Sequence, residues 1–515
     1  MAPSTRLAVI DLGSNSFRLV VFEAGEGWWR RTDEIYEPVR IGEGLMASGR
    51  LGEEPARRAL ATLDVFAHFC RANGLGAEEV DAVATSAVRD AENAEQFLVR
   101  ARERFGLPIR VLSREQEAYH GYLAAVNSTT LSDGGVLDLG GGSMQLVRVA
   151  DRHALDSGSW RLGTVRMSER FLPPNGPAKR RQLNELREHI AAELEGTPWL
   201  EALQAGGGGR IVGIGGTVRN LAAAAQRAAG LPTNGVQGMV IDVPALEELI
   251  ERLAALPADE RASVPGIKPA RADLILAGAV VVREALRAGG FEALETTEAG
   301  LREGVFFDRF LADRPGAAGG RLFDDVRRAS VMNMATQYRV DGPHTRHVAT
   351  LALGMFDELA RLGLHDGDER ERELLWAACM LHDIGMSIDY DDHHKHSRYL
   401  ILNGGLPGFA PVETAIVAQA ARYHRKGMPS PGPMAALFGE GDVERLDRLA
   451  SLLRLAEDLE RSRDQLVRGT DISEHDGQVR LRLIAEGDPA VPRWAAGREN
   501  ELFARAFHRG LEVAA

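Results

Sequence analysis

Residues 6–23, RLAVIDLGSNSFRLVVFE, contain two apolar runs on either side of a short polar turn. The runs 6–11 and 17–23 have the length and branched side chains of buried strands, and LGSNS between them has the composition of a tight turn. The stretch therefore predicts a β-hairpin whose first strand ends at Asp11. A turn of Gly, Ser and Asn presents backbone N–H groups with little side-chain bulk, which suits the oxygens of a phosphate.

A second hairpin of the same design follows later in the chain. GVLDL (135–139) and MQLVRV (144–149) read as strands, and the turn GGGS (140–143) joins them. Asp138 stands before this turn as Asp11 stands before the first one. A carboxylate at such a strand end can hold a divalent cation or its water. The two hairpins therefore indicate an internal repeat at the level of supersecondary structure.

A third glycine-rich turn follows the repeat. A loop of four consecutive glycines (206–209) comes first. RIVGIGGTVRN (210–220) then reads as a strand that leads into a helix, and the turn is the GIGGT between them. One such turn is weak evidence of phosphate binding because glycine-rich hairpin turns are common. Two turns of one design together with this third one favour a shared function. The order of elements predicts two α/β halves with a cleft between them.

Other elements are expected from apolar periodicity: a helix at about 55–72, a strand at 80–88 and a strand at 109–112. Ser113 and Gln116 have the spacing of a capping box, so a helix is expected to begin there and to carry Glu117 in its first turns.

ADRPGAAGGR (312–321) is the clearest linker in the chain. After it the pattern is almost wholly helical to about residue 468, and a small α+β appendage is expected at 472–513.

The composition limits the classes of function. The 515 residues carry a net charge of −13, so a polyanion would need a local basic groove, and nucleic-acid binding is not expected. The two cysteines cannot form a disulfide scaffold, which favours a reducing cytoplasm. No apolar run reaches the ~18–20 residues of a membrane span, and the N-terminal stretch lacks a secretory apolar core, so no membrane association is expected.

At the level of motifs, the sequence resembles the Ppx/GppA family of exopolyphosphatases and guanosine pentaphosphate phosphohydrolases within the actin/Hsp70/sugar-kinase superfold. The three glycine-rich turns that carry the resemblance are Ile10–Ser16, Val136–Ser143 and Gly213–Thr217. Further matching segments are Ala84–Arg89, Ser113–Ala118, Glu298–Gly304, Tyr338–Asp341, Met380–Gly385, His394–Ser397 and Arg422–Lys426. The later segments resemble the longer, exopolyphosphatase-like members, so the resemblance covers nearly the whole chain.

The resemblance implies an α/β fold with two actin-like ATPase (RNase H-like) lobes, an all-α HD-like domain and a small C-terminal α+β domain. The expected boundaries are 1–128 for lobe I, 129–312 for lobe II, 320–470 for the HD-like domain and 471–515 for the last domain. A homodimer is expected as well.

The resemblance also implies a set of site residues. The expected phosphate ligands are Gly13, Ser14, Asn15, Ser16, Arg89, Gly140, Gly141, Gly142, Ser143, Gly216 and Thr217. The expected ligands of Mg²⁺ (or Mn²⁺) are Asp138, Asp11 and Glu117, and a monovalent cation is a further candidate cofactor.

Glu117 is the expected general base. Hydrolysis of a phosphoanhydride needs a water that is oriented and partly deprotonated in line with the terminal phosphorus. Without the resemblance, an acid near a helix N-terminus is more simply explained by its interaction with the helix dipole. Arg89 follows a strand-like run, and its guanidinium fork suits phosphate oxygens, although a lone arginine is by default a solvated surface residue.

One position departs from the family pattern. Gln145 stands where the family usually has a glutamate in Gly-Gly-Gly-Ser-x-Glu-Leu. A glutamine can position a water but cannot take up a proton or bind a cation as a carboxylate does. Either Glu117 and Asp138 suffice for the reaction, or the metal site is weaker.

The helical region contains a His/Asp set. His382-Asp383 resembles the signature of HD phosphohydrolases, whose domains often hold divalent metal; His347 matches the first ligand, and Glu457 or Asp458 the last acidic one. HD-like domains joined to exopolyphosphatases generally form a wall of the substrate channel, so a structural role is expected. The segment Arg422–Lys426, with His424, is interpreted as part of a basic channel rim.

These observations together predict an exopolyphosphatase that releases orthophosphate from the end of inorganic polyphosphate. The alternatives are hydrolysis of guanosine pentaphosphate (pppGpp) on the same site, a non-catalytic polyphosphate or (p)ppGpp sensor, and a sugar-kinase-like phosphotransferase. Because the chain is acidic, a long substrate needs a positive path to the cleft. The candidates for that path are Arg166, Arg219, Lys268, Arg302 and the segment Arg422–Lys426.

Overall fold

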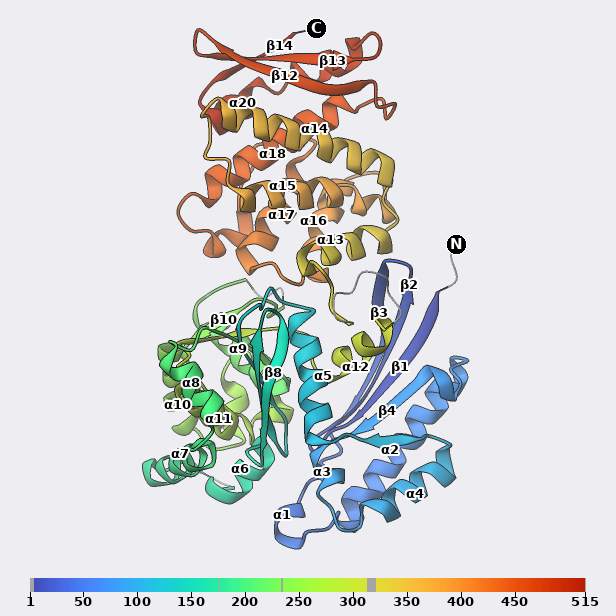
Figure 1. Cartoon of the computed structure of the whole chain (residues 1–515), viewed down its shortest axis with the longest axis vertical. Helices are drawn as coiled ribbons and strands as arrows, with labels where there is room; N and C mark the ends of the chain where they lie inside the picture. Colours follow the sequence, from blue (N-terminus) through green and yellow to red (C-terminus); the bar gives the residue numbers. More distant parts are fainter. Residues whose placement is uncertain (1–3, 175, 233–234, 313–320, 515) are drawn as a thin grey trace. The chain divides into compact units, whose positions relative to one another are not determined.

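The computed structural model describes residues 4–174, 176–232, 235–312 and 321–514 (Figure 1). Its contacts divide the chain into two compact units, residues 1–326 and 327–515. Most of the linker expected at 312–321 lies outside the described residues. Among the helices of the described ranges, none is long and apolar enough to cross a membrane.

The first unit begins with a five-stranded sheet of order β3-β2-β1-β4-β5. Its strands are β1 (Thr5–Leu12), β2 (Phe17–Gly25), β3 (Trp28–Glu37), β4 (Val80–Ala84) and β5 (Ile109–Val111). The hairpin expected from the sequence is confirmed, because β1 and β2 pair antiparallel with Asp11 opposite Arg18. β4 and β5 then extend the sheet in parallel. The turn at 13–16 therefore lies at the carboxyl end of β1, between two inner strands of the sheet.

The second sheet repeats this topology, with the order β10-β11-β9-β6-β7-β8. Its strands are β6 (Gly134–Leu139), β7 (Met144–Ala150), β8 (His153–Trp160), β9 (Arg210–Ile214), β10 (Val240–Asp242) and β11 (Ala293–Thr296). Antiparallel β6, β7 and β8 correspond to β1, β2 and β3, and parallel β9 and β11 correspond to β4 and β5. The internal repeat expected from the two hairpins is confirmed at the level of strand order, and β10 is an addition to it.

Helices pack on these sheets. They are α1 (Leu45–Ser48), α2 (Glu53–Ala72), α3 (Ser86–Arg89), α4 (Ala94–Phe105), α5 (Arg114–Val126), α6 (Thr164–Phe171), α7 (Arg180–Leu194), α8 (Pro198–Ala205), α9 (Gly216–Ala228), α10 (Val243–Ala254), α11 (Ile275–Gly289) and α12 (Leu301–Phe310). The strand expected at 80–88 is shorter than predicted: β4 ends at Ala84, and Ser86–Arg89 forms a helical turn. This turn carries Arg89 away from the sheet and toward α5.

Helix α5 is the central element of the first unit. Its expected capping box is confirmed: Gln116 N–H donates to Ser113 Oγ at 3.2 Å, and Ser113 N–H donates to Gln116 Oε1 at 2.9 Å. In Figure 1 the helix lies between the two sheets and beside α12, and it contacts β6, β7 and β8. Nine of its thirteen residues are buried, Glu117 among them. A carboxylate in its first turn is thereby carried into the interior.

The second unit is mainly helical, as the sequence predicts. Its elements are α13 (Val326–Gln337), α14 (Gly342–Arg361), α15 (Glu369–Leu381), α16 (His393–Gly404), α17 (Pro411–Tyr423), α18 (Asp442–Leu459), β12 (Val467–His475), β13 (Gln478–Ala485), α19 (Ala490–Ala496), α20 (Asn500–Phe507) and β14 (Gly510–Ala514). The last three strands form one sheet of order β12-β13-β14. Val467, Leu481 and Phe503 from this region share one hydrophobic core with the helices.

Candidate active site

A cavity of about 100 Å³ lies in the first unit where the glycine-rich turns of both sheets meet. The expected turns contribute Gly13–Ser16, Gly140–Gly141 and Gly215–Gly216 to its lining. The three expected acids Asp11, Glu117 and Asp138 also line it. Segments that are more than 200 residues apart in the sequence are thus brought to one polar cavity.

The turns of the two hairpins approach each other so closely that glycine is required in the second one. A Cβ atom on Gly141 would lie 3.2 Å from Ser14 Cβ, and one on Gly142 would collide with Ser86 Oγ. Ser14 and Ser86 hydroxyls are themselves 3.0 Å apart and hydrogen-bonded. The absence of side chains here leaves space for an anion between facing turns.

Three carboxylates converge at the cavity, and they come from three different elements: Asp11 from β1, Glu117 from α5 and Asp138 from β6. Burial raises the pKa of each of them. The pKa of Asp138 rises to about 7, first because of burial and then because of the negative charges of Glu117 and Asp11. Oxygen ligands that repel one another in a buried site fit a hard divalent cation such as Mg²⁺, whose charge relieves the repulsion.

Glu117 is held by hydrogen bonds on both of its oxygens. Arg89 Nη1 donates to Oε2 at 2.7 Å, and Ser143 Oγ donates to Oε1 at 3.5 Å. Burial raises the pKa of the Glu117 carboxyl, and Arg89 opposes that rise. Arg89 Nη1 also donates to Leu112 O at 3.0 Å, which fixes the guanidinium against the start of α5. The carboxylate is therefore fixed in place, with a positive charge that favours its ionised form.

Gln145 acts on the cavity only through Ser143. Its Nε2 donates to Ser143 Oγ at 2.8 Å and to Ser159 Oγ at 3.3 Å. The side chain is buried and does not line the cavity. Its amide therefore supports the serine that contacts Glu117, and this is not the position of a metal ligand.

Four arginines also line the cavity: Arg18, Arg219, Arg271 and Arg302. Burial, together with the neighbouring charges of Arg302 and Arg18, lowers the pKa of Arg219 to about 10. Arg302 Nη1 donates to Asp11 Oδ2 at 3.1 Å. Such a concentration of buried positive charge favours a polyanionic ligand.

The sequence identified two of these arginines, Arg219 and Arg302, and missed Arg18 and Arg271. The hairpin register could have identified Arg18, because a turn at 13–16 places residue 18 opposite Asp11. Arg271 comes from a loop before α11, and no pattern in the sequence indicates that it reaches the third turn. A Cβ on Gly216 would collide with its guanidinium, which explains the glycine at that position.

Some residues expected to bind phosphate do not line the cavity: Arg89, Gly142, Ser143 and Thr217. Arg89 and Ser143 contact Glu117, as described above, and Thr217 packs under the third turn next to Gly278. Arg166, expected on a positive path, braces the second turn instead: its Nε donates to Gly142 O at 2.8 Å and its Nη2 to Asp90 Oδ2 at 2.7 Å. Lys268 does not line the cavity either.

In the second unit the His/Asp set differs from the sequence expectation in two residues. His347 does not join His382 and Asp383, because its Nε2 contacts Val467 O at 2.8 Å and Glu460 at 3.5 Å. His344, one helical turn earlier on α14, takes that place. His424, expected on an exposed rim, is buried beside Asp383. Both errors concern which face of a helix is buried.

Comparisons with known proteins agree with this architecture. Residues 20–312 match the sequence model of the Ppx/GppA phosphatase family, and residues 326–488 match that of Ppx/GppA phosphatase domain III. The crystal structure of the Aquifex aeolicus member of the Ppx/GppA family is 28% identical, with a TM-score of 0.51, over 59% of this chain and 97% of that one.

Two further solved structures are similar over the same share of this chain. An exopolyphosphatase from Cytophaga hutchinsonii is 23% identical with a TM-score of 0.54, over 59% of this chain and 97% of its own, a likeness of fold. An exopolyphosphatase-like protein is 27% identical with a TM-score of 0.53, over 59% of this chain and 96% of its own. Because the two family models match residues in both units, and because the first unit contains the paired glycine-rich turns, the chain belongs to the Ppx/GppA phosphatase family.

Proposed function

We propose that this protein is an exopolyphosphatase that hydrolyses the terminal phosphoanhydride bond of inorganic polyphosphate. The observation that carries the proposal is the combination, in the lining of one cavity, of facing glycine-rich turns, three carboxylates and four arginines. A chain of phosphates that carries a negative charge on every unit matches such an arginine-rich lining. The similarity to the Cytophaga hutchinsonii exopolyphosphatase in fold and the family membership are consistent with it.

In the proposed reaction the terminal phosphoryl group lies between the turns 13–16 and 140–141, whose backbone N–H groups bind its oxygens. Glu117 orients a water and accepts one of its protons. The water oxygen forms a bond to the terminal phosphorus as the bridging P–O bond breaks, and the electron pair of that bond leaves with the shortened chain. The products are orthophosphate and a polyphosphate that is shorter by one unit.

The residues present fit a divalent cation at this site, because three buried carboxylates repel one another there. Asp138, Asp11 and Glu117 would hold Mg²⁺ or Mn²⁺, which would neutralise charge on the phosphoryl oxygens when bound. Arg302 already offsets part of the charge of Asp11. The arginines Arg219 and Arg271 would contact phosphates further along the chain.

The test is release of orthophosphate by the purified full chain with Mg²⁺, from long-chain polyphosphate and, separately, from pppGpp at equal concentrations of terminal phosphate. The proposal predicts the larger kcat/KM on polyphosphate. A larger kcat/KM on pppGpp would replace it with the pentaphosphate phosphohydrolase. Binding of polyphosphate without any turnover would make the protein a sensor.

A further inference from the structure

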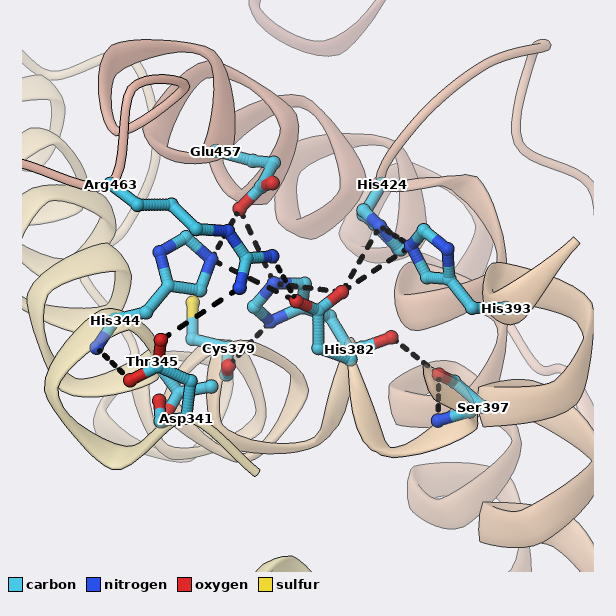
Figure 2. Close-up of polar contacts among 12 residues, drawn as sticks. Asp341, His344, Thr345, Cys379, His382, His393, Ser397, His424, Glu457 and Arg463 are labelled. Atoms are coloured by element: carbon cyan, nitrogen blue, oxygen red, sulfur yellow. Dashed lines mark hydrogen bonds and ion pairs between the residues drawn. The ribbon is translucent and has the colours of Figure 1, made fainter. Parts of the chain in front are cut away.

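The second unit contains a buried cluster of four histidines and two carboxylates that the proposed hydrolysis does not use (Figure 2). The cluster, called here the histidine cluster, consists of His344, His382, Asp383, His393, His424 and Glu457. His344 comes from α14, His382 and Asp383 follow α15, His393 begins α16, His424 follows α17 and Glu457 lies on α18. The four imidazoles and Asp383 are each at most 6% exposed. Five helices thus direct ligating side chains at one point.

The donor atoms of the histidine cluster form two groups that share Asp383. His344 Nε2 and His382 Nε2 lie 3.0 and 3.3 Å from Glu457 Oε2, and His344 Nε2 lies 3.9 Å from Asp383 Oδ2. On the other side, His393 Nε2 and His424 Nε2 lie 3.3 and 3.9 Å from Asp383 Oδ1. Donors around a tetrahedral ion with bonds of ~2.0–2.1 Å are about 3.4 Å apart. The observed separations bracket that edge length in both groups.

Three of the rings are oriented by backbone carbonyls. The Nδ1 atoms of His382, His393 and His424 lie 2.7, 2.8 and 2.7 Å from the carbonyl oxygens of Cys379, Tyr390 and Ala421. A carbonyl oxygen can only accept, so each Nδ1 carries the hydrogen, and Nε2 of a neutral ring presents a lone pair to the cluster. A hydrogen bond from the far ring nitrogen to a carbonyl is how proteins orient metal-binding histidines.

This orientation creates an electrostatic conflict that a cation resolves. His393 Nε2 and His424 Nε2 are 3.1 Å apart, so two ring lone pairs face each other in the interior. On the other side, two further ring nitrogens, His344 Nε2 and His382 Nε2, crowd around the single oxygen Glu457 Oε2. Buried polar atoms without partners are costly, and each of these is directed into the same small space.

Neither a proton nor Arg463 satisfies the whole cluster. A proton between His393 and His424 would relieve that pair alone, and His382, whose Nδ1 hydrogen is already used, would need a second proton to donate to Glu457. Arg463 Nη2 lies 2.8 Å from Asp383 Oδ2 and provides one positive charge at the edge of the cluster. Arg463 therefore pairs with Asp383 alone, and it does not donate a hydrogen bond to the facing Nε2 atoms of His393 and His424.

We propose that the histidine cluster is a metal centre for divalent transition ions, with two adjacent positions that share Asp383. One position has His344, His382, Asp383 and Glu457, and the other has Asp383, His393 and His424. Imidazole-rich sets with few carboxylates favour Zn²⁺ and its first-row neighbours over Mg²⁺ and Ca²⁺, which prefer oxygen ligands. The centre is separate from the oxygen-rich cavity of the first unit and does not depend on the proposed hydrolysis.

The histidine cluster borders a cavity through Asp383. A cavity of about 520 Å³ on the second unit is lined by Asp383, Arg463 and Asp341, among others. Asp383 therefore stands at the boundary between the cavity and the buried rings. Arg463, which lines the same cavity, contacts the shared carboxylate from that side.

The test measures metal binding by the full chain, not activity. The purified protein is stripped with a chelator, dialysed against excess Zn²⁺ and then against metal-free buffer, and its metal content is measured. The proposal predicts about one Zn²⁺ per chain or more after dialysis, and a visible d–d spectrum of tetrahedral type when Co²⁺ replaces Zn²⁺. Less than about 0.2 Zn²⁺ per chain together with no such Co²⁺ spectrum would overturn it.

Matched variants locate the ion. His344→Asn and His424→Asn are each expected to weaken Zn²⁺ binding at least tenfold and to change the Co²⁺ spectrum. His347→Asn, one turn away on the same helix, is the control and is expected to retain both. Equal losses in His344→Asn and His347→Asn would refute the assignment. Glu457→Gln, at the partly exposed edge of the cluster, provides the same comparison where a buried histidine variant fails to fold.

A final variant separates this centre from the cavity of the first unit. Glu117→Gln is expected to lose hydrolysis and to keep its Zn²⁺ content, because Glu117 is not part of the histidine cluster. Loss of Zn²⁺ in that variant would assign the ion to the cavity and would contradict the proposal. Failure of polyphosphate hydrolysis with intact Zn²⁺ binding would count only against the proposed function.

Discussion

Arg89 Nη1 donates a hydrogen bond to Glu117 Oε2 at 2.7 Å, and the two side chains are only 15% and 7% exposed. The arginine comes from the short helix α3 of the first sheet region, and the glutamate from α5. Burial raises the pKa of the Glu117 carboxyl, and the Arg89 charge lowers it. Arg89 therefore favours the ionised form of a buried carboxylate, a contact different from the phosphate contact expected from the sequence.

Glu117→Gln tests the base directly. The change keeps the size of the side chain and removes its ability to accept a proton, so kcat on polyphosphate should fall by a factor of about 10² or more while KM changes little. Orthophosphate release measures both. Glu115→Gln is the matched control, because Glu115 is exposed in the same helical turn and contacts Ser113. A kcat near that of the unchanged protein would remove Glu117 from the mechanism.

Arg89→Met should move the acid limb of the pH–rate profile. Without the guanidinium, the pKa of Glu117 rises further, so a higher pH is needed to ionise the base, and the limb is expected to shift upward by about one unit. The profile of kcat against pH measures the shift. Arg110→Met, which removes an exposed arginine paired with Asp81, should leave the limb in place. A lower kcat with an unshifted limb would make Arg89 a phosphate ligand instead.

Gln145→Glu should destabilise the protein and lower the rate. The glutamine amide donates to Ser143, whereas an ionised carboxylate would instead accept from Ser143 and draw its hydroxyl away from Glu117. Burial would raise the pKa of the new carboxyl above its unfolded value, so the loss of stability should grow as pH rises from about 5 to 8. Thermal unfolding at both pH values measures it. Ser159→Ala, which leaves the Ser143 contact, is the control; a faster Gln145→Glu enzyme would contradict this interpretation.

Arg271→Gln should weaken binding of polyphosphate. The side chain lines the cavity among other arginines, and loss of one charge-assisted contact is expected to raise KM about tenfold and to reduce the dependence of KM on salt. Steady-state kinetics at several salt concentrations measure both. Arg287→Gln, an exposed arginine paired with Glu284, should change neither. Equal effects of the two variants would mean that general charge, and not the cavity, binds the substrate.

Mg²⁺ should stabilise the protein more at high pH than at low pH. The pKa of Asp138 is raised to about 7, so the folded chain keeps a proton there that the unfolded chain releases near pH 4. Without metal, stability from this group falls as pH rises between those values, and a bound cation offsets the loss. Added Mg²⁺ is expected to raise Tm by about 3 °C or more at pH 8 and by less at pH 5. Asp138→Asn should remove the difference, and an equal shift at both pH values would count against an Asp138 site.

The sequence determined the parts of this protein that depend on local pattern. Strands β1, β2, β6 and β7 follow from apolar runs around glycine-rich turns, and the start of α5 follows from the Ser113 capping box. Strands β3 and β8 were not predicted, because each is largely polar and pairs at a sheet edge with one exposed face. Periodicity identifies buried strands more readily than such edge strands.

In the candidate site, too, some residues could be identified from the sequence and others only from the tertiary structure. Asp11 and Asp138 were identifiable because each precedes a glycine-rich turn. Glu117 was selected by the resemblance of Ser113–Ala118 to the family motif, since an acid near a helix N-terminus is otherwise explained by the helix dipole. Tertiary structure alone decided that Arg89 pairs with Glu117 and that Arg271 reaches the third turn, because both depend on contacts between distant elements. It also decided that His344, and not His347, faces His382. Residues three apart on a helix lie close to the same face, so only the packing of α14 against its neighbours determines which ring is buried in the histidine cluster.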